Sequence, residues 1–569
     1  MDMSASTPAD DFTLRDEVLD ALPIIQHVTS LLGLDELLDA HVPARDVRVQ
    51  LAPARSLSLM VSNLALNHAP LYALGEWAST LDAGLVGLAP GELELLNDDR
   101  VGRALLALFD ADRSTLLNAL VLRAVERFNV DVSELHNDST SIVLHGAYDD
   151  AVGLERGGKA TVVPARGHSK DHRPDLKQLL FILTVSGDGA VPVAHHVTHG
   201  NTEDSTTHVA TWDSLCQLFA RRDFLYVADS KLATRENMDH IASRQGRFVS
   251  VLPRTRKEDR AMRDWLVDNE PDWTEAFTRP PRYVGGDPNL YETVQAPWPS
   301  AEGYRVIWCR SSAKIDHDAE TRRSQVAAGI AAIDELNQRL ASPKTRMKEV
   351  VAIEAAARAA LEATSSSRWV RFELGEREEV RMRQETRGRP GANTRYRRIT
   401  RLRHYLSFSV NEDLVAHDAR SDGCWPLVTN DRDMAEAQLL VAYKRQPDLE
   451  RRHHQLKSDL FVAPMFLRDP ARIEGLMACQ FIALLVRSLV ELLVRRSMAE
   501  RKITDILIYP EDRASSAPST KRVFELFKGV TRHHLIDGEG HLLKTFSPTL
   551  TEKQLQLLDL LGVSADRYL

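Results

Sequence analysis

The chain has 569 residues, more than one hydrophobic core normally organises, so two to four domains are expected. Hydrophobic residues make up 43% and charged residues 27%, as in soluble globular proteins, so disorder is expected only in the polar segment of residues 1–13. The net charge is −9, but residues 1–100 alone hold 16 acids and 5 bases. The remainder therefore carries about +2 and has room for basic patches that bind nucleic acid.

The cysteines and the most apolar segment indicate in which cellular compartment the protein is expected. No cysteine belongs to a CxxC pair or to a zinc-finger spacing, so free thiols in a reducing cytosol are expected. No basic segment precedes the first apolar stretch, which argues against a signal peptide. The segment from Met477 to Val494 is interrupted by Arg487 and Glu491, which predicts a buried helix rather than a membrane span. We therefore expect a cytoplasmic protein with no membrane partner.

Residues 14–130 are predicted to form a helical N-terminal domain. The segments LPIIQHVTSLLGLDELLDAHV and SLSLMVSNLAL place apolar residues at helical spacing. Such a domain could bind DNA ends or hold two subunits together, and the sequence leaves both roles open. Its acidity makes direct contact with a DNA backbone less favourable.

From residue 131 onward the pattern changes to short strands. Strands are predicted at residues 135–144, 178–185, 190–198, 224–228 and 248–252, with a helix at residues 205–219 before the fourth strand. This order allows a three-stranded meander and then a helical crossover that makes the fourth strand parallel to the first. It is typical of a ribonuclease-H-like fold, of which residues 131–254 are the predicted first part.

The predicted fold is therefore multidomain α+β. Residues 255–405 are expected to be a mostly helical insertion in the core, with a helical pair at residues 318–363 and an Arg-rich stretch after it. The α/β pattern resumes at residues 406–500, the second part of the core, which ends in the buried helix. Residues 501–569 are expected to form a helical C-terminal tail.

Two aspartates lie where the predicted sheet could bring them together. Asp138 is inside a predicted strand, NDSTSI, where aspartate is rare, and Asp229 follows the strand FLYVA. Each taken alone is also compatible with a structural role, as a turn or helix-cap residue. In the predicted topology the first and fourth strands are neighbours, so the two carboxylates would lie side by side. Carboxylates forced together repel unless a divalent cation lies between them, and oxygen ligands suit Mg²⁺ or Mn²⁺.

A third acid is found in the segment YKRQPDLERRHHQLK, Tyr443 to Lys457. Pro447 fits the first turn of a helix, which places Tyr443 just before it and Glu450 in its first turn. Lys457 is seven residues further on, on nearly the same helix face as Glu450. A carboxylate and an ammonium on one face could bind a metal ion and a phosphate. The alternative is an ordinary charged face in contact with solvent.

These residues resemble a known family, the insertion-sequence transposases of the DDE type. One subgroup has the signature Tyr, two residues, Arg, three residues, Glu, six residues, Lys, and here the same spacing gives Tyr443, Gln446, Glu450 and Lys457. Gln446 stands where the subgroup has arginine and cannot form a charged clamp on phosphate; Arg445 or Arg451 could substitute for it. Four further segments share the resemblance: HNDSTSI, GHSKDHRPDLKQ, THGNTEDSTT and FLYVADSKLATREN.

The resemblance implies a ribonuclease-H-like core in which Asp138, Asp229 and Glu450 are the catalytic residues and hold two Mg²⁺ ions roughly 4 Å apart. The expected reaction is cleavage at the inverted-repeat ends of a transposon and joining to target DNA. The expected partners are therefore double-stranded DNA and, because two ends must be brought together, a second copy of the chain. Lys457 and Tyr443 would hold the phosphate near the cut.

Two basic segments are further candidates for DNA contact. Residues 381–403 hold nine arginines and one acid, and include Arg387 and Arg389 in the sequence RGRP, which is typical of minor-groove hooks. In the segment of residues 167–178, Lys170 and Arg173 could touch DNA near the site, or they could pair locally with the neighbouring aspartates. Two other functions stay open: a catalytically silent DNA-binding relative, and a host nuclease with the same fold.

Overall fold

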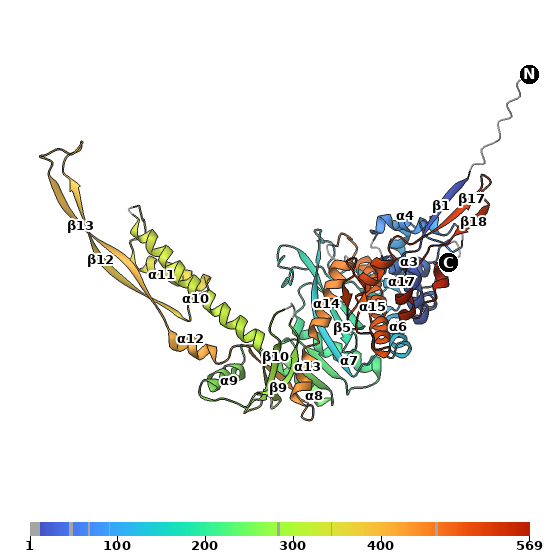
Figure 1. Cartoon of the computed structure of the whole chain (residues 1–569), viewed down its shortest axis with the longest axis horizontal. Coiled ribbons are helices and arrows are strands. Elements are labelled where there is room, and N and C mark those ends of the chain that lie inside the picture. Colours follow the sequence, from blue (N-terminus) through green and yellow to red (C-terminus); the bar gives the residue numbers. More distant parts are fainter. Residues whose placement is uncertain are drawn as a thin grey trace, which may run out of the picture. The chain divides into compact units, whose positions relative to one another are not determined.

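The computed structural model describes residues 12–44, 49–66, 69–89, 91–281, 285–342, 344–460 and 465–569. Residues 1–11, most of the tail predicted to be disordered, lie outside the described residues. The chain forms two compact units: unit 1 is Met1–Ser250 with Val441–Leu569, and unit 2 is Val251–Leu440 (Figure 1). The chain thus leaves unit 1 and returns to it, and the predicted insertion of residues 255–405 falls inside unit 2.

Unit 1 contains a mixed sheet with the strand order β6-β5-β2-β7-β8. Its strands are β2 (Glu134–Leu144), β5 (Lys177–Ser186), β6 (Pro192–Thr198), β7 (Leu225–Ala228) and β8 (Arg247–Val251). β2 pairs antiparallel with β5 and β5 with β6, whereas β7 runs parallel to β2 and to β8. This is the predicted meander followed by a parallel fourth strand, the arrangement of a ribonuclease-H-like core.

The crossover helices explain the parallel strands. α7 (His208–Phe219) connects β6 to β7, and α8 (Arg235–Ser243) connects β7 to β8. Parallel neighbours need such a helical connection because a tight turn can join only antiparallel strands. β5 and β7 are almost entirely buried, as their continuous apolar sequences predict.

The N-terminal part of unit 1 is helical, with one added strand, β1 (Thr13–Val18). Its helices are α1 (Leu22–Leu32), α2 (Leu34–His41), α3 (Pro53–Leu66), α4 (Leu74–Ser79), α5 (Asp98–Asp110) and α6 (Arg113–Arg127). The side chains of Asn97 and Asp112 accept backbone N–H groups and so cap α5 and α6. α3 and α5 pack against the long helix α15 (Pro470–Glu500).

α15 is the central helix of unit 1 and contains the apolar segment noted in the sequence. It is long and apolar enough to span a membrane, but 94% of its most apolar 18-residue window is buried inside the protein. The two charges that interrupt it are buried and paired, Arg487 with Asp459 at 3.2 Å and Glu491 with Arg452 at 2.8 Å. The prediction of a buried helix is confirmed.

The C-terminal part of unit 1 combines helices with strands. It contains β15 (Ile506–Leu507), β16 (Ala514–Ser515), α16 (Thr520–Phe527), β17 (Thr531–Ile536), β18 (Leu542–Phe546) and α17 (Glu552–Leu561). β17 pairs with both β1 and β18, so the two ends of the chain share one small antiparallel sheet. The structure thereby adds strands to the predicted helical tail, through a pairing between distant segments that no local pattern reveals.

Unit 2 contains an antiparallel series of strands in the order β14-β11-β10-β9 and several helices. The strands are β9 (Thr274–Arg279), β10 (Asn289–Gln295), β11 (Arg305–Ser311) and β14 (Cys424–Thr429). The helices are α9 (Lys257–Asp268), α10 (Ser312–Ala341), α11 (Val350–Ala363), α12 (Glu412–Ala419) and α13 (Glu436–Tyr443), whose last three residues already belong to unit 1. α10 and α11 are the predicted helical pair.

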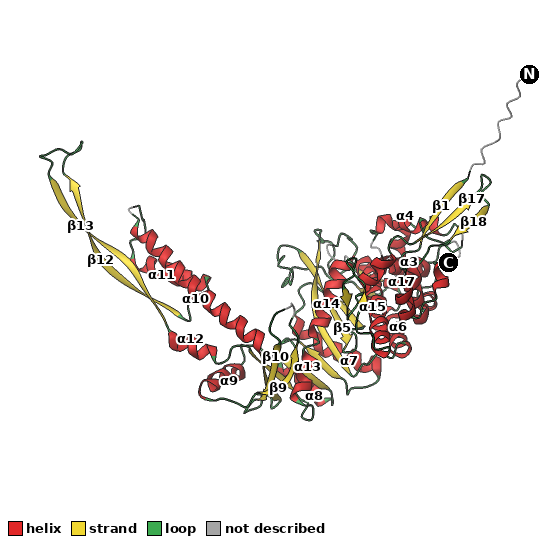
Figure 2. Cartoon of the chain, viewed as in Figure 1, coloured by secondary structure: helices red, strands yellow, loops and turns green. Residues whose placement is uncertain are grey.

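The Arg-rich stretch of unit 2 is a two-stranded antiparallel ribbon, β12 (Val370–Gln384) with β13 (Tyr396–Val410) (Figure 2). The base of this ribbon packs on α10 and α11 through a small apolar core that includes Ile333, Leu361, Val370 and Leu406. The insertion is therefore less helical than its sequence suggested, because these fifteen-residue strands lie where a basic segment without a clear period was found.

Candidate active site

The parallel pairing of β2 with β7 brings the two predicted aspartates together. Asn137 of β2 is paired with Ala228 of β7, so Asp138 and Asp229 are the next residue on each strand. Asp229 follows the last residue of β7, where its Oδ1 accepts the N–H of Lys231 at 3.0 Å. The N-cap of α8 is Thr234, so Asp229 is not the cap of that helix. A role as a helix cap therefore does not explain why an aspartate is found at position 229.

Burial and neighbouring charges make both carboxyls harder to ionise. Burial raises the pKa of Asp138, and the charge of Asp204 adds to that effect. Burial also raises the pKa of Asp229, followed by repulsion from Asp138. Close carboxylates of this kind are relieved by a divalent cation, which supplies two positive charges and prefers oxygen ligands. The carboxylates of Asp138 and Asp229 therefore have the chemistry of ligands for a divalent cation.

Lys170 places an ammonium group among these carboxylates. Its Nζ lies 3.4 Å from Asp138 Oδ1 and 3.2 Å from Asp204 Oδ2, and donates to the backbone oxygen of Ser139 at 2.6 Å. Burial alone would lower the pKa of Lys170, but the charges of Asp138, Asp204 and Asp229 raise it overall. Lys170 is therefore positively charged and partly neutralises the acids.

Two residues of this cluster were not singled out in the sequence, Asp204 and His453. Asp204 belongs to THGNTEDSTT, a segment that the family resemblance marks but that offers several polar side chains. The His453 side chain is 9% exposed, its Nε2 lies 3.8 Å from Asp138 Oδ2, and neither ring nitrogen has a hydrogen-bond partner among the described residues. Burial, with help from Lys170 and Lys457, lowers the pKa of His453 to about 3, so the ring is neutral.

The third predicted acid, Glu450, is not part of this cluster. It lies on α14 (Gln446–His454), which begins one residue before Pro447, so Glu450 is in the second turn rather than the predicted first. Its side chain is exposed. Among the described residues, no three His, Cys, Asp or Glu side chains are grouped closely enough to hold a metal ion. The structure brings together the two aspartates and leaves Glu450 apart from them.

Gln446, the position that departs from the family signature, is buried in a hydrogen-bond chain between α14 and β2. Its Oε1 lies 2.8 Å from His136 Nδ1, and its Nε2 donates to the backbone oxygen of Asn137 at 3.2 Å. His136 Nε2 lies 2.8 Å from Glu134, whose other oxygen accepts from Arg445 at 2.8 Å. Gln446 thus fixes the helix that carries Glu450 against the strand that carries Asp138. The guanidinium of Arg445 is already ion-paired with Glu134.

Two family models match parts of the chain. Residues 137–486, a span that includes Asp138, Asp229 and Glu450, match the model of the transposase DDE domain. The chain belongs to the DDE transposase family. Residues 15–122 of this transposase match a second family, a domain of unknown function (DUF4277).

Searches of curated proteins and of solved structures add no close relative of this transposase. No curated protein matches its sequence. Among solved structures, the cryo-EM structure of the piggyBac transposase synaptic complex with hairpin DNA is similar at 9% sequence identity and a TM-score of 0.26. The match covers 52% of this chain and 60% of that chain, less than two thirds of its length.

Several basic side chains that the sequence suggested for DNA contact are ion-paired within the transposase. Lys457 lies in the π-turn that follows α14 and pairs with Asp171 at 2.6 Å. Arg173 forms a two-point contact with Asp175 at 2.9 and 2.8 Å, the local pairing that the sequence left open. Such exposed pairs are weak, so DNA phosphates can displace them.

The remaining predicted contacts lie at different places in the fold. Arg451 pairs with Asp448 one turn earlier on α14, and Tyr443 is the last residue of α13. Arg387 and Arg389 lie in unit 2, exposed in the turn that joins β12 to β13.

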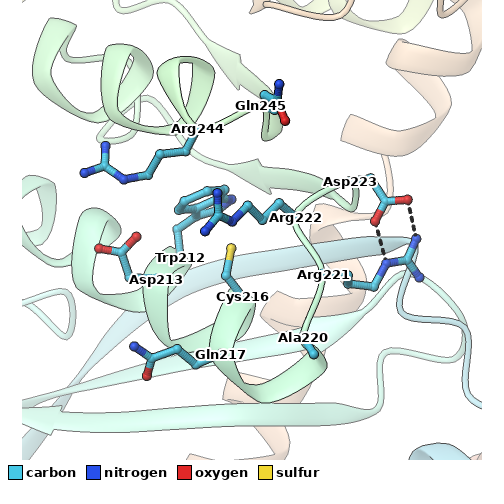
Figure 3. Close-up of a pocket in the computed structure, with 10 residues that line it drawn as sticks. All are labelled: Trp212, Asp213, Cys216, Gln217, Ala220, Arg221, Arg222, Asp223, Arg244 and Gln245. Atoms are coloured by element: carbon cyan, nitrogen blue, oxygen red, sulfur yellow. Dashed lines mark hydrogen bonds and ion pairs between the residues drawn. The ribbon is translucent and has the colours of Figure 1, made fainter.

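Unit 1 of the transposase also has an open cavity of about 660 Å³, bordered by Trp212, Cys216, Arg222 and Arg244 among others (Figure 3). Arg221 and Asp223 at its rim pair at 2.7 Å. Asp223 precedes β7 and Asp229 follows it, so the cavity lies at the opposite end of that strand from the acids. It is therefore separate from the acid cluster, which lies at the carboxyl end of β7, where ligand sites of α/β sheets form.

Proposed function

We propose that this chain catalyses cut-and-paste DNA transposition: cleavage at the inverted-repeat ends of a transposon, then transfer of the freed strands into target DNA. The observation that carries the proposal is the juxtaposition of Asp138 and Asp229 by the parallel pairing of β2 with β7. Their raised pKa values support a site that is completed by a cation. Two Mg²⁺ ions held there, or Mn²⁺, would activate the attacking oxygen and stabilise the leaving 3′ oxygen.

We propose Glu450 as the third catalytic carboxylate. His453 lies three residues further along α14, so the two side chains share a helix face. Because His453 lies 3.8 Å from Asp138, that face meets the acid cluster. In this proposal the long, exposed Glu450 side chain would rotate to bring its carboxylate toward the cation when DNA and metal bind.

The surrounding basic and polar side chains would bind DNA, as in the subgroup with the Tyr-Arg-Glu-Lys signature. Lys170 stands among the acids and is placed to contact a phosphate once a cation takes over their neutralisation. Lys457 would exchange Asp171 for a phosphate, and Tyr443 would orient the same strand. Gln446 takes no part in DNA binding in this proposal, because its amide is used to hold α14 on β2.

The test is a strand-cleavage and joining assay with the full-length protein and the DNA that flanks its gene, in Mg²⁺. We expect Asp138→Asn, Asp229→Asn and Glu450→Gln each to lower the cleavage rate by about a thousandfold or more, since each removes an oxygen ligand whose contribution is several kcal/mol. The matched control is Glu236→Gln, an exposed acid on α8 that should cut and join at the wild-type rate.

Each other outcome points elsewhere. Activity retained in Glu450→Gln would remove Glu450 from the site and turn attention to Asp204. Wild-type protein that binds the ends without cutting them would indicate a silent DNA-binding relative. Cleavage without joining, at any sequence, would indicate a nuclease. We further propose that the active form pairs two copies of the chain in the cytoplasm, because two transposon ends must be joined in one event; chemical crosslinking with and without end DNA tests this.

A further inference from the structure

The β12–β13 ribbon has two chemically different faces in its outer half. Directly paired residues of an antiparallel ribbon project from the same side, and successive pairs alternate between sides. One side of residues 377–383 and 397–403 carries the pairs Arg377 with Arg403, Glu379 with Arg401, Arg381 with Ile399, and Arg383 with Arg397. We call this side the arginine face.

Repulsion between the arginines of this face destabilises the ribbon when nothing is bound to it. Glu379 pairs with Arg381 and Arg403. Four further arginines are exposed and have no ion-pair partner among the described residues: Arg377, Arg383, Arg397 and Arg401. Arg383 lies directly opposite Arg397, and such like-charge pairs destabilise a ribbon. A polyanion would relieve this repulsion.

The opposite face carries mostly uncharged side chains, and its charged residues in the outer half are Glu378 and Arg398. Near the base of the ribbon, Phe372 and Leu374 pack against the apolar core formed with α10 and α11. Further out, Met382 and Leu402 are each 64% exposed. Arg398 lies opposite Met382 in the strand register, so it is the arginine of the outer half that projects from this side. The arginines are therefore sorted to one side.

We propose that the arginine face is a DNA-binding surface that docks against the phosphates of duplex DNA along the major groove. A two-stranded ribbon fits the major groove of B-form DNA, which is about 12 Å wide. The seven outer residues of each strand extend roughly 23 Å, enough to follow the groove past several phosphates. This surface lies in unit 2, away in sequence from the acids, and the proposal holds whether or not those acids cut DNA.

Two neighbouring arginines give a matched test. Arg397→Gln and Arg398→Gln remove the same charge one residue apart, from exposed positions on opposite faces. Binding of the full-length protein to a 40-bp duplex of mixed sequence would be measured by fluorescence anisotropy in EDTA, across a range of salt concentrations. We expect Arg397→Gln to lower the salt slope of log K by about 1, and Arg398→Gln to leave it nearly unchanged.

The double variant Arg383→Gln/Arg397→Gln should weaken binding on the order of tenfold. It should not lower the Tm, because it removes an opposed like-charge pair. Equal losses in Arg397→Gln and Arg398→Gln would overturn the proposal in favour of a non-directional charge effect.

A duplex RNA of the same sequence separates groove docking from general attraction to a polyanion. The deep, narrow major groove of A-form RNA does not admit a ribbon, so we expect the RNA to bind more weakly than the DNA, and Arg397→Gln to change its affinity less. Duplex RNA that binds as tightly as DNA and is equally sensitive to Arg397→Gln would overturn docking in the major groove.

Discussion

Asp138 illustrates how a residue that is unfavourable for its local structure can be explained by its neighbours. Aspartate is rare within strands, and burial makes its charged form less stable still. The cost is partly offset by Lys170, whose ammonium lies 3.4 Å away. Conflicts of this kind between local preference and position are expected at functional sites.

The pKa of Asp138 leads to a prediction about stability. Because folding raises this pKa above 3.8, the folded state holds its proton more tightly, and the stability contributed by the protonated form is lost as the pH rises through the folded-state pKa. Asp138→Asn should therefore raise the Tm by roughly 1–4 °C at pH 7.5 without divalent cations, and by less as the pH approaches 4. Thermal unfolding followed by circular dichroism measures the Tm of the wild type and the variant at each pH.

A cation provides the control for this prediction. Mg²⁺ should raise the Tm of the wild type and have a smaller effect on Asp138→Asn, because only the wild type keeps both carboxylates that are proposed to bind the ion. A variant that is less stable than the wild type at pH 7.5 would show that the pairing with Lys170 outweighs the burial of the carboxyl.

At the scale of elements, α14 is held in place by polar contacts on two sides. Gln446 binds it to β2, and Arg452 binds it to α15. The buried Arg452 guanidinium also donates to the backbone oxygens of Gly189 and Ala190. The helix that carries Glu450 is thus positioned by hydrogen bonds whose geometry is fixed, whereas an apolar contact would allow it to slide.

The Arg452 and Glu491 pair predicts strong coupling. Arg452→Met should lower the free energy of unfolding by about 3–5 kcal/mol, since it removes the closest ionic partner of the buried Glu491 and leaves it only Arg495, at 3.5 Å. Arg452→Met/Glu491→Leu should recover a large part of that loss, because neither charge of the pair then remains in the core. Urea unfolding of the two single variants and the double variant gives the coupling energy. A double variant whose loss equals the sum of the single losses would mean that the pair is not coupled.

The ribbon is the element whose structure differs most from its sequence pattern. Its strands contain many Arg and Glu residues, which have no strong strand preference, and the sequence predicts only an Arg-rich stretch within a mostly helical insertion. The fifteen-residue pairing of β12 with β13 and the packing of Val370 and Leu406 on the helical pair decide its conformation. These are contacts between residues far apart in sequence.

At the scale of the whole molecule, the free cysteines report on global folding. Cys309, Cys424 and Cys479 are buried, and Cys216 is half-buried. Burial raises the pKa of Cys216 to about 11 and that of Cys424 and Cys479 to about 12, so little thiolate is present at pH 8.

A thiol titration tests this arrangement. The native protein should react rapidly with fewer than about one equivalent of a thiol reagent at pH 8, because the reactive thiolate is scarce and covered. All four thiols should react in denaturant. The slow reaction of the native protein should follow the rate of unfolding as urea is added. Rapid reaction of two or more native thiols would contradict the burial described here.

What the sequence determined by itself was local or carried by motifs. The apolar runs predicted β5 and α15, the element order predicted the crossover that makes β7 parallel to β2, and that topology in turn predicted the pairing of Asp138 with Asp229. These inferences succeed because side-chain periodicity and strand order follow directly from the chain.

Which distant side chains come into contact depends on how the elements pack against one another. Lys170, Asp204 and His453 meet at Asp138, and Gln446 reaches His136 across 310 positions of sequence. The same holds for the sorting of the arginines to one face of the ribbon, because a shift of one residue in register would exchange its two faces. Contacts of this kind depend on packing between elements, and no spacing along the chain encodes them.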